Sequence, residues 1–129
     1  MVFYPISVLI LAGIREILII STPQDLQFLK KLLETIEQWG VKFSFKEQIL
    51  PDGLAQAFIL GEECIGDQSV CLILGDSIFY GQGFSPKLKQ SASLEQGAVI
   101  FGYRIKDAER FGVAEIDCCG RVRSLEEKP

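Results

Sequence analysis

The segment Val70–Gly81, VCLILGDSIFYG, is the part of the sequence on which the fold prediction depends. Its first five residues form an unbroken apolar run, which is typical of a strand buried on both faces of a parallel sheet. Gly75 and Asp76 end this run. Open α/β sheets bind ligands beyond the carboxyl ends of their strands, so Asp76 is predicted to lie in a binding cleft. The alternative is that Asp76 only caps the following turn.

The composition is that of a globular domain. The chain has 129 residues, of which 48% are hydrophobic and 23% charged, and its net charge is −4. This length suffices for one domain with its own core. The acidic balance argues against a nucleic-acid partner, because phosphate backbones bind to positive surfaces. A small polyphosphate ligand would need a metal ion to bind to such a protein.

Histidine is absent, which removes the commonest general base and the commonest metal ligand. The four cysteines show no C-x-x-C spacing, so a zinc site is not expected. Cys64 and Cys71 have apolar neighbours and are predicted to be small core residues. Disulfide geometry disfavours a bridge between the adjacent Cys118 and Cys119. A reducing cytoplasm is the simplest compartment for this chain.

The N-terminal apolar segment is predicted to be a buried helix. It has neither the basic residue nor the A-x-A site of a signal peptide. Its run from Ile6 to Ala12 is shorter than the roughly 20 residues that span a bilayer. Pro5 and Gly13 suit the two ends of a helix. We therefore expect no membrane partner.

Apolar periodicity predicts helices and strands in alternation along the rest of the chain. Ser21-Thr22-Pro23 is a helix start, with a hydroxyl cap before a proline, and Gly40 ends that helix. The other predicted elements are strands at 17–20, 41–45, 70–74 and 98–103, helices at 54–64 and 85–94, a helical turn at 107–110, and a hairpin of 113–116 with 122–125. This alternation predicts an α/β fold with an open, mostly parallel Rossmann-like sheet.

The predicted sheet is incomplete. No strand precedes the first helix, and neither G-x-G-x-x-G nor G-x-x-x-x-G-K-[ST] occurs. A doubly wound sheet usually has its first strand near the middle, followed by a glycine-rich phosphate loop. The sequence therefore predicts that residues 1–129 form a partial domain whose first strand is missing.

Short motifs along the whole chain resemble, in order, those of the glucose-1-phosphate thymidylyltransferases, nucleotidyltransferases that make dTDP-glucose. The combination of PDGLAQA, LGD-x-IFYG and SLEEKP is specific, although each motif alone is weak. The matching residues are Tyr4-Pro5, 11–15, 19–25, 51–57, 74–76, 78–81, Glu109-Arg110, Gly112-Val113 and 124–129. The resemblance implies the nucleotide-sugar transferase type of fold and a homo-oligomer.

The resemblance also implies a reaction and a set of site residues. In this family a phosphate oxygen of glucose 1-phosphate attacks the α-phosphorus of dTTP and pyrophosphate leaves, which depends on positioning and charge neutralisation. The implied site residues are Asp76 for Mg²⁺, Gln48 and Gly53 for thymine, and Gly112, Glu127 and Lys128 for the sugar phosphate. Carboxylates suit Mg²⁺, amides suit a pyrimidine edge and lysine suits a phosphate.

Each of these roles has a simpler alternative. Gln48 could be an ordinary loop residue, and Gly53 could only serve a turn. Gly112 could mark the start of a strand. The charged residues at 126–128 could be solvated, as charge runs usually are.

The sequence also departs from the family pattern. The G-G-x-G-T-R loop, the P-K segment after it and the second metal carboxylate are absent, and Ser77, Phe111 and Ile49-Leu50 replace the usual residues. Loss of one group that stabilises transition-state charge typically costs about 10²–10³-fold in rate. We therefore expect the isolated chain to be inactive. The alternatives to a transferase are a non-catalytic fragment that binds a sugar nucleotide weakly or only self-associates, and an unrelated flavodoxin-like domain, which the motif order disfavours.

Overall fold

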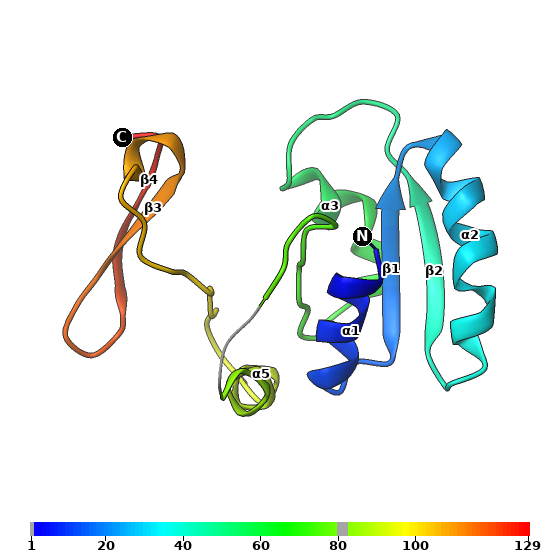
Figure 1. Cartoon of the computed structure of the whole chain (residues 1–129), viewed down its shortest axis with the longest axis horizontal. Helices are drawn as coiled ribbons and strands as arrows, with labels where there is room; N and C mark the ends of the chain where they lie inside the picture. Colours follow the sequence, from blue (N-terminus) through cyan, green and yellow to red (C-terminus); the bar gives the residue numbers. More distant parts are fainter. Residues whose placement is uncertain (1, 80–82) are drawn as a thin grey trace. The chain divides into compact units, whose positions relative to one another are not determined.

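The computed structural model describes residues 2–79 and 83–129, which form two compact units, Met1–Gln96 and Gly97–Pro129. The first unit contains a parallel strand pair with helices, and the second contains an antiparallel hairpin (Figure 1). The predicted α/β class with a parallel sheet is therefore confirmed. Tyr80 and Gly81 of the LGD-x-IFYG motif lie outside the described residues.

A strand–helix–strand motif forms the centre of the first unit. Strand β1 (Glu16–Ser21) leads through helix α2 (Pro23–Glu37) to strand β2 (Lys42–Glu47). The two strands are parallel, with Glu16 opposite Lys42 and Ser21 opposite Glu47. The predicted helix start is confirmed, because the Thr22 hydroxyl accepts a hydrogen bond of 3.3 Å from the backbone N–H of Asp25. Parallel strands need such a crossover, which a two-residue turn cannot supply.

The core of this unit lies between these strands and two helices. Helix α1 (Phe3–Leu11) runs alongside β1, and α2 runs alongside β2 (Figure 1). The buried core consists of Ile6, Leu9, Ile17, Leu33, Ile36, Val41 and Phe43. Helix α1 was expected to be buried all round, which is wrong, since Tyr4 is 57% and Leu11 53% exposed. The buried residues of α1 are Pro5, Ile6 and Leu9.

The described residues of the first unit also contain the helices α3 (Gln56–Leu60), α4 (Glu62–Ile65) and α5 (Phe84–Ala92). The sequence predicted one helix at 54–64 in place of α3 and α4. The break falls at Gly61, which is buried against β1. A Cβ at this position would lie 2.9 Å from Cδ2 of Leu18. Glycine allows that close approach, and it is also a weak helix former.

Residues 70–74, predicted to be the central strand, form no strand. Val70 is 51% and Leu72 47% exposed, and only the neighbouring Ile73 packs against the core. A strand exists only where a second strand bonds to it, and no described residue does so here. The segment 98–103 was also predicted to be a strand and forms none for the same reason.

The cysteine predictions need one correction. Cys64 and Cys71 are exposed and do not belong to the core. The segment that contains Cys71 has no sheet to bury it, and Cys64 lies on the short helix α4. Cys118 and Cys119 are both free thiols, with their sulfur atoms 3.9 Å apart, as the geometry argument predicted.

The second unit is a hairpin preceded by one helical turn. The 3₁₀ turn η1 (Ala108–Arg110) leads into strand β3 (Gly112–Ile116), which pairs with strand β4 (Val122–Glu127). Asp117 closes the hairpin, because its Oδ1 accepts hydrogen bonds of 2.9 Å from the backbone N–H groups of Cys119 and Arg121. Both the turn and the hairpin were predicted, and both are confirmed.

Candidate functional site

Two of the predicted site residues line one small cavity in the first unit. Gln48 and Gly53 share this cavity of about 180 Å³ with Gly75, the residue before Asp76. The remaining wall is apolar and comes from β1, Leu54, α3 and residues 72–74. Ligand pockets usually measure about 300–1,000 Å³, so this cavity has room for only part of a nucleotide.

The chain folds in this way because β2 ends at Glu47 and the following loop turns back toward β1. The backbone N–H of Gln48 still donates a hydrogen bond of 2.9 Å to the Ser21 carbonyl, which ties Gln48 to the carboxyl end of β1. The side chain of Gln48 is half-buried. This is the edge at which a parallel sheet binds its ligands.

The Gln48 amide has a side-chain partner that the sequence analysis did not identify. Its Nε2 donates to Oε1 of Gln56 at 2.5 Å, and Nε2 of Gln56 donates to Oδ2 of Asp52 at 3.2 Å. Both partners belong to the PDGLAQA motif. Asp52 lies four residues before Gln56, in the loop that precedes α3, and this closeness in the sequence is the signal that could have identified the pair.

Gly53 has a positive φ of +93°, a conformation that other residues rarely adopt. A Cβ at this position would meet no atom within 4 Å. The backbone conformation of the turn, rather than crowding by protein atoms, therefore requires glycine here. The same open space leaves the backbone at Gly53 accessible to a ligand in the cavity.

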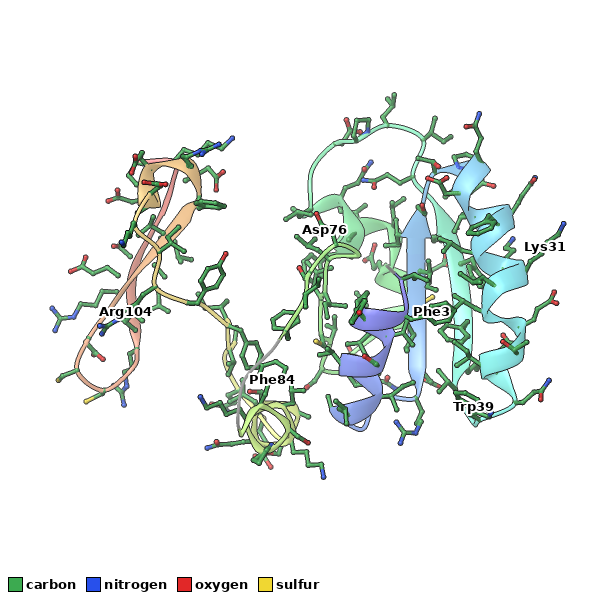
Figure 2. All side chains as sticks on the ribbon, in the orientation of Figure 1. Phe3, Lys31, Trp39, Asp76, Phe84 and Arg104 are labelled. Carbon is green, nitrogen blue, oxygen red and sulfur yellow. The ribbon has the colours of Figure 1, made fainter. Side chains whose placement is uncertain are left out.

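Asp76 lies at the end of the unit to which the carboxyl ends of β1 and β2 point (Figure 2). Its side chain is exposed, and it directly follows a residue that lines the cavity. Within residues 2–79 and 83–129, no three acidic, cysteine or histidine side chains gather where they could hold a metal ion. Mg²⁺ commonly binds through one or two carboxylates plus substrate phosphates and water, so Asp76 fits such an ion when phosphates supply the other ligands.

The three predicted sugar-phosphate residues lie together in the second unit. Gly112 is opposite Glu127 in the β3–β4 ladder, and the backbone N–H of Lys128 donates a hydrogen bond of 3.0 Å to the Phe111 carbonyl. Lys128 has a φ of +46°, which is uncommon for a residue with a side chain. Such strained positions occur often at ligand sites. The hairpin therefore places a carboxylate and an ammonium group on consecutive residues at the end of β4.

A larger cavity of about 400 Å³ lies between β1 and the segment 68–73. Its wall includes Ile17, Leu18 and Ile20 of β1 and Val70, Leu72 and Ile73 opposite them. Cys71 is exposed as a residue but also lines this cavity, where desolvation by the surrounding atoms raises the pKa of its thiol. Within the described parts of the chain, β1 pairs only with β2, so its other backbone edge faces this cavity unpaired.

None of the helices within residues 2–79 and 83–129 combines the length and the apolar character that crossing a bilayer requires.

Comparison with known proteins gives matches over the whole chain. The family described as "Nucleotidyl transferase" matches residues 1–129. A glucose-1-phosphate thymidylyltransferase from Neisseria gonorrhoeae is 55% identical over 129 residues, and one from Xanthomonas campestris is 49% identical. These matches cover 100% of this chain but 45% and 44% of the two relatives, so the chain spans less than half of their length.

A solved structure gives the same result for the fold. A protein from Bacillus anthracis, named as a glucose-1-phosphate thymidylyltransferase, superposes with a TM-score of 0.86 at 30% sequence identity. The superposition covers 99% of this chain and 51% of that one.

Proposed function

Because this chain belongs to the nucleotidyl transferase family, we propose that it takes part in the synthesis of dTDP-glucose and pyrophosphate from dTTP and glucose 1-phosphate. The observation that supports this best is the shared cavity of Gln48 and Gly53 beside the Gly75-Asp76 step. A base-reading amide and a carboxylate for phosphate-bound Mg²⁺ must lie near each other if one nucleotide is to contact both. The relatives that are 55% and 49% identical to this chain are named glucose-1-phosphate thymidylyltransferases.

The proposed roles divide between the two units. In the first unit, Gln48 offers an N–H group and a carbonyl oxygen to the thymine edge, and the Gly53 backbone contacts the same ring. Asp76 would hold Mg²⁺, which when bound neutralises phosphate charge during transfer. In the second unit, Glu127 accepts hydrogen bonds from sugar hydroxyls, Lys128 contacts the phosphate, and Gly112 leaves space for the sugar.

The transfer itself needs groups that align the two substrates. The phosphate oxygen of glucose 1-phosphate bonds to the α-phosphorus of dTTP while the bond to pyrophosphate breaks. The G-G-x-G-T-R motif, which supplies positive charge to the triphosphate in the family, does not occur in these 129 residues, and their net charge is −4. We therefore propose that these 129 residues bind both substrates but do not turn them over unaided. We further propose a cytoplasmic location and homo-oligomeric assembly.

A binding experiment tests this function. ¹H–¹⁵N NMR spectra of the ¹⁵N-labelled chain are recorded in the presence of Mg²⁺ while dTTP or glucose 1-phosphate is added. Shifts around Gln48, Gly53 and Gly75 with dTTP, and around Gly112 and Glu127 with glucose 1-phosphate, are expected. The variant Gln48→Leu should reduce the dTTP response, and Gln38→Leu on the exposed end of α2 is its control. The absence of any response to either substrate would refute the proposal.

A specific observation favours the alternative of a non-catalytic chain that self-associates. The edge of β1 opposite β2 and the apolar segment 70–74 both have no strand partner among the described residues. Unpaired edges of this kind are templates for pairing with another chain. The alternative predicts an assembly in solution and no response to substrates in the same spectra.

A further inference from the structure

Three side chains form a directed chain of hydrogen bonds behind the small cavity. Gln48 donates to Gln56 at 2.5 Å, and Gln56 donates to Asp52 at 3.2 Å. Gln48 is the member that lines the cavity, whereas Gln56 and Asp52 do not line it. Gln56 is the first residue of α3 and is half-buried, so the helix holds the middle member of the chain in place.

The direction of these bonds follows from the chemistry of their last member. An ionised carboxylate only accepts hydrogen bonds, so Gln56 must turn its NH₂ group toward Asp52. Its carbonyl oxygen then points to Gln48, and a carbonyl oxygen also only accepts. Gln48 must therefore turn its NH₂ group toward Gln56. If the Gln48 amide rotated by a half turn, two carbonyl oxygens would face each other.

We propose that Gln56 and Asp52 are positioning residues that hold the Gln48 amide in one orientation and thereby select a pyrimidine with a carbonyl group, rather than an amino group, at ring position 4. The proposal rests on the proposed role of Gln48 as the contact to the base.

The two kinds of pyrimidine differ in the order of their hydrogen-bonding groups. Thymine and uracil present a carbonyl acceptor beside an N–H donor, whereas cytosine presents an amino donor beside a ring-nitrogen acceptor. An amide that rotates freely can match either edge, because a half turn exchanges its donor and its acceptor. An amide fixed by Gln56 matches one edge and leaves the other with unpaired polar groups, which is costly in a half-buried site. The fixed orientation thus converts a general pyrimidine contact into a selective one.

The experiment compares dUTP with dCTP, since neither carries the 5-methyl group and they differ only at the edge in question. Binding to the full 129-residue chain with Mg²⁺ is followed through backbone and Gln side-chain amide signals. The wild-type chain is expected to bind dUTP about tenfold or more tightly than dCTP. Gln56→Leu removes the hydrogen-bond partner of Gln48. Asp52→Asn allows the Gln56 amide to adopt either orientation. Both variants should bring the ratio of dUTP to dCTP affinity close to one.

A double variant separates orientation from general structural support. In the combined variant Asp52→Asn with Gln56→Glu, the new carboxylate at position 56 accepts from both neighbours. The orientation of Gln48 is therefore restored, and the preference for dUTP should return. Gln38→Leu serves as the matched control, and circular dichroism checks that each variant is folded.

The outcomes distinguish this inference from the proposed function. If neither nucleotide shifts any signal of the wild-type chain, the proposed base site and this inference are both refuted. If the wild-type chain binds dUTP and dCTP equally, the base site stands and the selection by Gln56 and Asp52 is wrong. The selection is also wrong if folded Gln56→Leu and Asp52→Asn chains keep the wild-type ratio.

Discussion

Gly112 and Glu127 are directly opposite each other in the β3–β4 ladder, and a Cβ on Gly112 would lie 3.2 Å from Oε2 of Glu127. Gly112→Ala should therefore push the Glu127 carboxylate by a few tenths of an ångström and leave the hairpin folded. If Glu127 contacts the sugar, the affinity for glucose 1-phosphate should fall by up to about tenfold. A titration followed by the Gly112–Lys128 amide signals measures the change.

Gly102→Ala is the control for this prediction, because a Cβ on Gly102 would meet no atom within 4 Å. It lies in the same unit as Gly112. Equal loss of affinity in both variants would mean that the effect does not come from Glu127.

The 129-residue chain should release no pyrophosphate from dTTP and glucose 1-phosphate, even with saturating Mg²⁺. The physical reason is that the 129 residues do not contain the G-G-x-G-T-R motif, and each lost charge-stabilising group typically costs about 10²–10³-fold in rate. A coupled pyrophosphate assay measures the rate. Pyrophosphate release that disappears in Asp76→Asn would contradict this prediction, because it would show that Asp76 supports turnover without the missing loop.

Local signals explain which parts of the fold could be predicted from the sequence. The cap at Thr22, the proline after it and the turn at Asp117 act within a few residues, and all lie where the sequence indicated. The strand prediction for residues 70–74 was wrong because strand formation depends on a neighbouring strand, which the apolar pattern within the segment cannot reveal. The exposure of Cys71 follows from the same missing pairing.

The residues of the candidate site were predicted only where the family resemblance assigned them a role. It indicated Gln48 and Gly53, and the structure places both on one cavity. It gave no role to Gln56, whose importance depends on the direction of two hydrogen bonds. Such a direction is a property of folded side chains, and the spacing of Asp52 and Gln56 only suggests that the two can meet.

Leu33 is the most deeply buried large side chain of the first unit, at 1% exposure. Leu33→Ala should lower the free energy of unfolding by about 2–5 kcal/mol, because it removes apolar contacts and leaves a cavity between α2 and the sheet. Phe28→Ala on the same helix is the control, since Phe28 is 68% exposed and its loss should cost less than about 0.5 kcal/mol. Urea denaturation measures both. Similar losses for the two variants would show that α2 does not pack through Leu33.

Desolvation raises the pKa of the Cys71 thiol above 9.0, its ordinary value. Well below pH 9.0 the thiol is protonated in both the folded and the unfolded chain, so its contribution to stability is fully present. As the pH rises above 9.0 the unfolded chain ionises first, and stability should fall. A chain with Cys64, Cys118 and Cys119 replaced by serine isolates this thiol. Thiolate absorbance should show a higher midpoint in the folded chain than in urea, and equal midpoints would contradict the prediction.

One edge of β1 has no partner strand among residues 2–79 and 83–129, and segment 70–74 is apolar and forms no strand. Both features should make the isolated chain self-associate. Leu72→Lys places a charge in the cavity between them and should shift the chain toward a monomer, because a charge on an edge opposes pairing with a second chain. Leu50→Lys is the control, since Leu50 is 62% exposed in a loop and does not line the cavity between β1 and segment 68–73. Sedimentation velocity measures the assembly state. A wild-type chain that sediments as a monomer at all concentrations would contradict this prediction. It would indicate that β1 and segment 70–74 do not pair with a second chain.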